Sequence, residues 1–258
     1  MAFYLQDQAI QFITIDEDAI SQIQGVFQRR LDILSRELTN EKIHLTYIIR
    51  FDGKGYKLFD PIELKQYFRE ARSIERIVFT IESQLALDSA RKVGTYLELY
   101  LNSNNANNSG LIASSHDHTE WAENSFNGAS ILLRKFRNLN YIIHNPLSGL
   151  VIRLASLFIL FAISILLTAK IPLNPHLENG KLFSFLLIFL TFSNIYTYIN
   201  KQGHWLISQQ FPIIKFLNNK QKTIHWLAQA AIWTSLAWIV KEFINLAMSY
   251  QSILFIVK

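Results

Sequence analysis

The sequence contains no cysteine, and charged residues make up only 17% of it. The absence of cysteine excludes disulfides, thiolate metal ligands and thiol nucleophiles. The charged fraction lies below the roughly 25% that is usual in soluble domains. Half of the residues are hydrophobic. This composition is typical of a chain that combines a modest soluble domain with membrane-spanning segments.

Acidic residues are almost missing from the second part of the chain. Residues 148–258 contain nine Lys/Arg and two Asp/Glu, whereas residues 1–147 contain 16 and 18. The net charge of +5 therefore arises in the second part. Because the first part has no net positive field to attract phosphates, this distribution favours contact with anionic lipid headgroups and argues against direct nucleic-acid binding.

Signature motifs of common enzyme classes are also missing. The sequence contains no GxxxxGK[ST], GxSxG, HExxH or GxGxxG pattern. His116, Asp117, His118 and Glu120 have side chains that can bind metals, but histidines at i and i+2 do not converge on one site in a helix. We interpret this cluster as a solvated loop before a helix. We predict no catalytic residues, no metal site and no cofactor.

The hydrophobic periods of residues 1–147 indicate an α+β fold. We expect about five antiparallel strands and three helices. Spacings of three and four residues predict helices over 16–38, 61–71 and 117–137. Stretches that are β-branched, aromatic or alternating predict strands over 43–51, 56–59, 74–83, 95–102 and 111–115, with a four-residue turn at 52–55.

One predicted helix, 16–38, leaves two interpretations open. Its apolar residues form a single stripe of Ile20, Ile23, Phe27, Leu31, Leu34 and Leu38. Such a stripe packs a helix onto a sheet. It is also the pattern of a short self-association seam between two copies of the chain.

Two segments are apolar enough to cross a membrane. Residues 154–173 contain one charge, Lys170, and residues 182–200 contain none. About 20 helical residues at ~1.5 Å each span the ~30 Å hydrocarbon core. Basic residues precede the first segment and follow the second. The positive-inside rule then places residues 1–147 and 201–222 in the cytoplasm. The first residues lack the pattern of a cleaved signal peptide, which agrees with this orientation.

The stretch 203–219 is apolar but too short to cross, and Pro212 interrupts it. We interpret it as a broken element at the membrane interface. Trp205 and Phe211 would lie at headgroup level, and Arg153 would act as an anchor at the start of the first span.

Residues 224–250 form an amphipathic helix on helical spacing, and they complete an all-α membrane domain over 148–258 with two to three spans. Lys241 and Glu242 interrupt an otherwise uncharged run, with Asn245 nearby. The helix either crosses with this pair turned into a cavity or lies in the interface with the pair toward water. In a crossing helix, Lys241 marks an ion path or simply extends toward the headgroups.

The predicted spans also contain polar stripes. Ser156, Ser164 and Thr168 share one face of the first, and Thr191, Asn194 and Tyr198 share one face of the second. Hydrogen bonding between helices explains such residues. Alternatively, they line a pore formed by several copies. The candidate pore-lining residues are Ser164, Thr168, Thr191, Asn194, Tyr198, Lys241, Glu242 and Asn245.

The organisation of the chain resembles small transmembrane effectors of bacterial antiviral systems, of the retron or abortive-infection type. The stretches IHLTYIIRFDGKGYKLFD, IERIVFTIES and QQFPIIKF are similar to segments of uncharacterised bacterial membrane proteins. The resemblance implies that residues 1–147 are a compact cytosolic sensor or docking domain held inactive by a partner. It also implies spans that damage the bacterial inner membrane once released. The partner would be a cytosolic protein or a ribonucleoprotein.

We therefore expect a non-enzymatic effector whose spans form homo-oligomers in the lipid bilayer and permeabilise it. A membrane anchor or scaffold that recruits a protein partner is the alternative. An enzyme would need acids and histidines to converge in residues 1–147.

Overall fold

The computed structural model describes residues 3–39, 41–171 and 179–217, and five further residues at 234, 238, 241, 242 and 245. The chain forms two compact units. The N-terminal unit combines Met1–Tyr141 with Pro212–Lys222, and the hairpin unit combines Ile142–Phe211 with Thr223–Lys258. The first division lies close to the expected boundary at residue 147. The sequence analysis did not predict that Pro212–Lys222, which follows the hairpin, belongs to the N-terminal unit.

The N-terminal unit contains a six-stranded antiparallel sheet with the strand order β1-β7-β6-β5-β3-β4. The sequence-based prediction of an antiparallel α+β domain is confirmed, and the edge strand β1 is an addition to it. The strands are β1 (Tyr4–Ala9), β3 (Ile43–Phe51), β4 (Lys54–Leu58), β5 (Ile74–Ser83), β6 (Tyr96–Asn102) and β7 (Gly110–Ser115).

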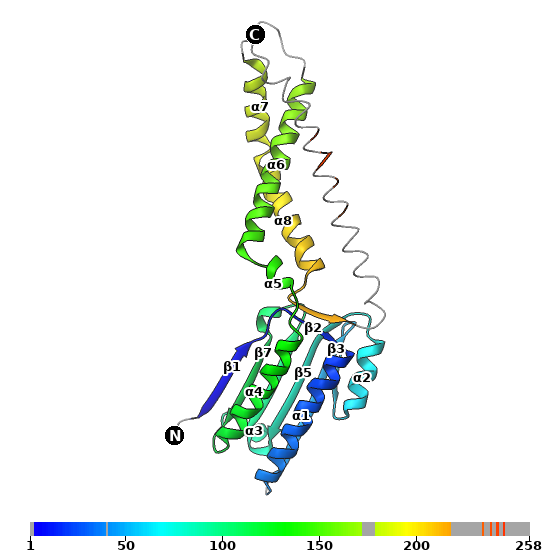
Figure 1. The fold of residues 1–258 in the computed structure, drawn as a ribbon, viewed down its shortest axis with the longest axis vertical. Helices are drawn as coiled ribbons and strands as arrows, with labels where there is room; N and C mark the ends of the chain where they lie inside the picture. The colour runs from blue at the N-terminus through cyan, green and yellow to red at the C-terminus, as the bar shows by residue number, and fades with distance from the viewer. Residues whose placement is uncertain are drawn as a thin grey trace. The chain divides into compact units, whose positions relative to one another are not determined.

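Three longer helices lie side by side on one face of this sheet (Figure 1). Asp16 caps the first by accepting a hydrogen bond from the Ala19 amide at 2.9 Å. Asp60 caps the second in the same way, with Pro61 as its first residue. The helices are α1 (Glu17–Glu37), α2 (Pro61–Glu70) and α4 (Thr119–Lys135), with the short α3 (Gln84–Asp88), α5 (Asn140–Ile143) and the 3₁₀ turn η1 (Ala106–Asn108) between elements.

The core lies between these helices and the sheet. Leu97, Leu99 and Leu101 alternate along β6 and are fully buried, whereas the residues between them are partly exposed on the opposite face. The ring of Phe27 in α1 packs 5.4 Å from the ring of Phe79 in β5. The apolar stripe of α1 is thus used for packing on the sheet, which favours that interpretation over a self-association seam.

The turn between β3 and β4 is tighter than the sequence suggests. It consists of Asp52 and Gly53, which have φ values of 50° and 76°. Two positive φ angles are typical of a type I′ turn, whose twist matches that of the flanking strands. The Asp52 carboxylate accepts hydrogen bonds from the amides of Arg72 and Ser73. The predicted four-residue turn is therefore corrected to two residues, and β4 begins at Lys54.

A second, two-stranded sheet joins distant parts of the chain. Strand β2 (Ile13–Asp16) pairs in parallel with β8 (Ile214–Leu217), which follows the hairpin. Ile15 and Ile214 are fully buried. This strand corrects our assignment of residues 214–217 to the membrane interface. Pro212 does end the preceding helix, but the β-branched residues after it form a strand of the N-terminal unit.

The hairpin unit consists of three helices: α6 (Pro146–Lys170), α7 (Gly180–Thr191) and α8 (Ser193–Gln210). By length and composition, α6 can cross a membrane, and α7 and α8 can do so together as one span bent by 50°. The predicted second span 182–200 thus falls on a broken pair of helices. Helix α8 continues to Gln210, where we expected a separate interfacial element.

The predicted third span, 224–250, lies outside the described residues except at five positions. Thr234, Trp238, Lys241, Glu242 and Asn245 are helical and exposed. They include the polar residues that helical spacing assigns to one face.

Candidate functional site

The interior of the hairpin unit is lined by hydroxyl groups from α6. Ser156, Ser164 and Thr168 are all buried, although α6 is otherwise strongly apolar. Each hydroxyl donates a hydrogen bond to the carbonyl four residues earlier in the same helix, at 2.7 to 2.9 Å. This local bond satisfies the hydroxyl without a partner on another helix. Small side chains at these positions also allow helices to approach closely.

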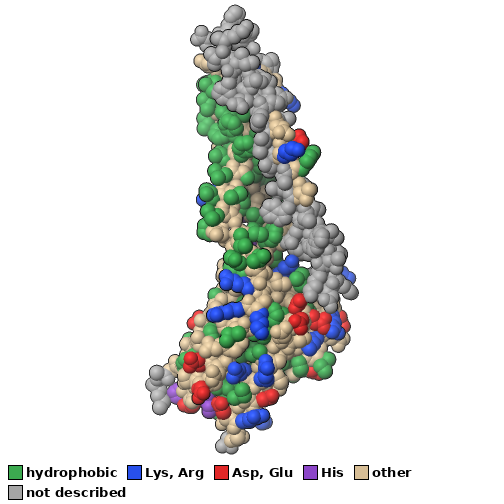
Figure 2. Space-filling view, in the orientation of Figure 1, with side chains coloured by type: hydrophobic (Ala, Val, Ile, Leu, Met, Phe, Trp, Pro, Cys, Tyr) green, Lys and Arg blue, Asp and Glu red, His purple; other side chains and the backbone are tan. Residues whose placement is uncertain are grey.

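The outer surface of the hairpin unit is apolar instead. Only 28% of the most apolar stretch of α6 is buried in the structure, which distinguishes it from the core helix of a soluble protein. Figure 2 shows mainly hydrophobic side chains over α6 and α7, whereas charged side chains are distributed over the surface of the N-terminal unit. Exposed members of this surface include Leu154, Leu157, Phe158, Phe183, Leu187 and Leu190. Such a surface is stable in lipid and unfavourable in water.

The predicted polar stripe of the second span faces outward. Thr191, Asn194 and Tyr198 are exposed, and the Thr191 hydroxyl donates to the Leu187 carbonyl at 2.7 Å. The two stripes that the sequence analysis groups together therefore have different environments. Ser164 and Thr168 lie inside one copy of the hairpin, whereas the stripe around Asn194 is accessible from outside it.

The three predicted interface anchors have different degrees of exposure. Arg153 and Trp205 are exposed on α6 and α8, whereas Phe211 is half-buried at the end of α8. The carbonyl oxygen of Phe211 lies 2.6 Å from Nε2 of His144, just before α6. This contact joins the two ends of the hairpin within its own unit.

The N-terminal unit holds the same two chain ends from its side. The side-chain amide of Asn140 donates to the carbonyl of Pro212 at 2.9 Å. Asn138 donates from its backbone to Phe12 and from its side chain to Thr14, beside β2. Sequence reasoning missed these residues. Their signal was the series of asparagines between the last helix of the α+β domain and the first span.

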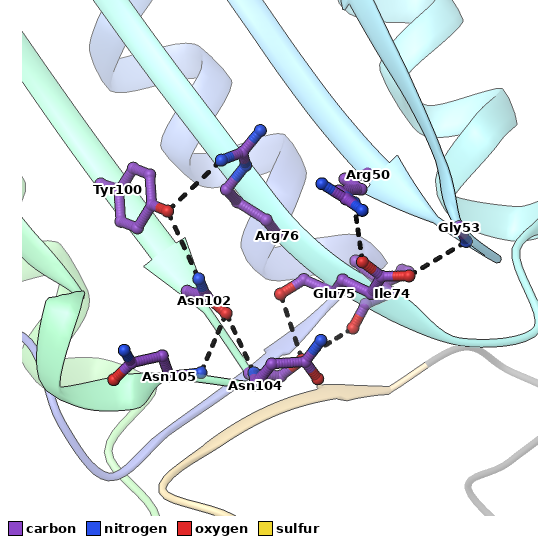
Figure 3. A network of polar contacts seen from close by, with 10 residues as sticks. Arg50, Gly53, Ile74, Glu75, Arg76, Tyr100, Asn102, Asn104 and Asn105 are labelled. Atoms are coloured by element: carbon purple, nitrogen blue, oxygen red, sulfur yellow. Dashed lines mark hydrogen bonds and ion pairs between the residues drawn. The ribbon is translucent and has the colours of Figure 1, made fainter.

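A polar network lies at one end of the sheet, on the face opposite α1, α2 and α4 (Figure 3). Arg50 and Glu75 form an ion pair at 2.8 Å, and Glu75 also accepts from the Gly53 amide. Arg76 donates to the hydroxyl of Tyr100 at 3.5 Å. This hydrogen bond is the main reason why the pKa of Tyr100 is lowered. The Nε atom of Arg76 is buried and has no partner among the described residues.

A second charged cluster lies at the other end of the same strands. The guanidinium of Arg91 lies 2.7 Å from Glu98 and 3.2 Å from Glu82, and it stacks over the ring of Tyr96. Because its charges are paired, this cluster has the character of a structural ion network.

The predicted solvated cluster shows no convergence of metal-binding groups. His118 lies 3.2 Å from Glu37, and His116 lies 3.8 Å from Asp117. Across the part of the chain that the structure describes, no group of three or more His, Cys, Asp or Glu side chains is arranged to hold a metal ion.

Comparison with known proteins gives no guide to function, because the chain matches no protein-family model, no curated protein and no solved structure.

Proposed function

We propose that this protein is a non-enzymatic effector of the bacterial inner membrane. In this proposal, a protein or ribonucleoprotein partner controls the N-terminal unit in the cytoplasm, and several copies of the hairpin associate to permeabilise the bilayer. A role in antiviral defence, as the resemblance implies, is part of the same proposal.

The observation that carries the proposal is the pairing of β8 with β2. The chain leaves the N-terminal unit after Tyr141 and returns at Pro212. Only a few residues separate each hairpin helix from this unit. A change in the N-terminal unit therefore moves both ends of the hairpin together, as expected if the unit controls the state of the spans.

The return of the chain also supports a specific topology. A segment that starts and ends in one folded unit crosses a membrane an even number of times. Helix α6 and the bent pair α7–α8 supply two crossings. The basic residues before α6 and after α8 then favour the cytoplasmic side for the whole N-terminal unit.

The exposure of the polar stripes supports an assignment of the pore surface. Residues between copies must be accessible on each copy before assembly. Thr191, Asn194 and Tyr198 meet this condition, as do Lys241 and Glu242. Ser164 and Thr168 would reach a pore only if the hairpin opened. We therefore assign the α7–α8 stripe as the primary lining.

A membrane anchor or scaffold is the second candidate. The observation that favours it is the local satisfaction of the hydroxyls of Ser156, Ser164 and Thr168 within α6. Polar groups that are already satisfied do not require a water-filled pore. Under this alternative, replacing the hairpin by an unrelated pair of spans would preserve activity.

Membrane potential in bacteria, followed with a voltage-sensitive dye, tests the proposal. The full chain should depolarise cells on induction when genes for candidate partners are absent. Thr191→Leu with Asn194→Leu should lower the depolarisation, because it removes the polar lining. Ser193→Leu is the matched control, since Ser193 is exposed on another side of α8.

Two further results complete this test. Lys241→Leu with Glu242→Leu should lower depolarisation if this pair lies beside the conducting path. If the purified full chain releases neither ions nor dye from liposomes in the absence of any partner, the permeability function is wrong and the anchor is favoured.

A further inference from the structure

A cavity of about 570 Å³ lies within the hairpin unit, between the first turns of α6 and the last turns of α8. This volume is in the range of sites that hold small molecules. Its walls come from α5, α6 and α8 and are partly apolar, with Ile152, Trp205 and Ile207 among them. The proposed pore surface contributes none of its residues to these walls.

Two glycines shape this cavity. A Cβ atom on Gly203 would lie 2.9 Å from Ile152, so the absence of a side chain lets α6 and α8 approach closely there. A Cβ atom on Gly149 would lie 3.8 Å from the imidazole of His204. The ring of His204 therefore lies next to the position that a side chain at residue 149 would occupy. A larger side chain at Gly149 would extend into the cavity.

The polar groups at the cavity suit a phosphate ester. His204 and Ser208 line it, four residues apart on α8, and the Ser208 hydroxyl donates to the Trp205 carbonyl at 2.8 Å, which leaves His204 as the available donor. Lys201 is exposed three residues before His204, which places Lys201, His204 and Ser208 on one stripe of the helix. Arg153 is exposed on α6, next to the wall residue Ile152. An imidazole and a hydroxyl thus lie beside apolar walls, and the cations of Lys201 and Arg153 are on the same two helices, outside the residues that line the cavity.

We infer that this cavity binds one anionic phospholipid. The phosphate would lie against His204, with Lys201 one turn further along α8, and an acyl chain would follow α6 from Ile152 toward the middle of the span. The excess of basic residues over 148–258 provides charge complementarity to such a lipid. Trp205, at the same level of α8, is the type of side chain that concentrates at membrane interfaces. The inference depends only on insertion of the hairpin and does not require conductance.

Lipid retention by the purified full chain tests the inference. Native mass spectrometry from detergent, with added palmitoyl-oleoyl phosphatidylglycerol or phosphatidylcholine, gives the affinity for each lipid. We expect roughly fivefold tighter binding of phosphatidylglycerol, as one well-placed basic residue provides. Gly149→Leu should abolish this preference by filling the cavity, and Lys201→Gln should remove most of it.

Two matched variants serve as controls. Ala155→Leu introduces the same side chain on the exposed side of α6, and Lys181→Gln removes one charge from α7, away from the cavity. Both should bind phosphatidylglycerol as the unchanged chain does. Equal affinity for the two lipids would overturn the inference, as would equal losses in all four variants.

A competition experiment distinguishes a lipid from a free anion. Millimolar inorganic phosphate should leave phosphatidylglycerol bound, because the acyl chain contributes to affinity. Displacement by phosphate would overturn the assignment to a lipid. Since this readout involves no ion flux, failure of the permeability proposal leaves it intact.

Discussion

The two units differ in which side chains they bury: the N-terminal unit buries apolar side chains, whereas the hairpin unit exposes many of them and buries several hydroxyl groups. In the N-terminal unit, Phe27 and Phe79 are buried and charged groups lie outside. In the hairpin unit, Ser164 and Thr168 are buried, whereas Leu157 and Phe183 are exposed. This difference is the one expected if the hairpin unit lies in lipid, because water drives apolar groups inward and lipid does not.

The largest expected effect comes from removing one aromatic ring from each unit. Phe27→Ala should lower the free energy of unfolding by about 3–5 kcal/mol, because it leaves a cavity in a closely packed core. Phe183→Ala should change it by less than ~1 kcal/mol, since that ring is 69% exposed. Thermal unfolding in detergent measures both. Similar losses would mean that the outer surface of the hairpin is packed against protein.

A charge on each outer surface sharpens the same comparison. Leu157→Arg places a cation on the exposed side of α6, at a cost of about 3 kcal/mol for insertion near the middle of a span. Carbonate extraction should show a lower fraction of the protein in membranes. Ile62→Arg, on the exposed surface of α2, should leave that fraction unchanged. The assignment of α6 as a span is wrong if both variants stay in the membrane equally.

Strand β8 follows the hairpin in the sequence but belongs to the N-terminal unit, so a substitution in β8 tests whether the two are coupled as the pairing predicts. Ile214→Ala should destabilise the N-terminal unit by about 2–4 kcal/mol, because Ile214 is fully buried there. Hydrogen exchange should then show faster exchange of the amides of β2. Gln209→Ala, exposed near the end of α8, is the control and should have no such effect. Faster exchange confined to α6–α8 would contradict the pairing.

The smallest expected effect concerns the hydroxyl of Tyr47, which makes no hydrogen bond among the described residues, whereas the buried hydroxyl of Ser164 makes one. The hydroxyl of Tyr47 is buried without a hydrogen-bond partner among the described residues, and burial raises the pKa of Tyr47 to about 12. Tyr47→Phe should therefore stabilise the N-terminal unit by up to ~1 kcal/mol. Tyr100→Phe should destabilise it by a similar amount, since Arg76 and Asn102 donate to that hydroxyl. Denaturant titration measures both, and a loss of stability in Tyr47→Phe would reveal a partner for its hydroxyl.

Local patterns were sufficient to predict most elements of the α+β domain. The alternation along β6 and the stripe of α1 each reflect one buried face, which a single segment of sequence displays. Strands β2 and β8 were missed for the opposite reason. Each has only four residues, and each is stabilised by a partner strand 201 positions away in the sequence. The hydrophobic pattern within either segment contains no information about so distant a partner.

The candidate pore residues show a similar limit. The sequence places Ser164 and Thr168 on one face of a helix, but it does not specify whether that face meets another helix or lipid. The rotation of α6 against α7 and α8 decides this, and rotation depends on how side chains of all three helices fit. Helical spacing alone therefore grouped buried and exposed residues together.

The pairing of β2 with β8 also has a consequence for biosynthesis. Residues up to Tyr141 leave the ribosome first, but the N-terminal unit lacks β8 until the chain has been made as far as Leu217. By then both crossings of the proposed hairpin have been synthesised. Folding of the N-terminal unit is thus completed only after the whole hairpin has been synthesised. If the hairpin inserts into a membrane as proposed, a chain that inserts incorrectly would leave the edge of β2 unpaired, in a form that cellular proteases can recognise.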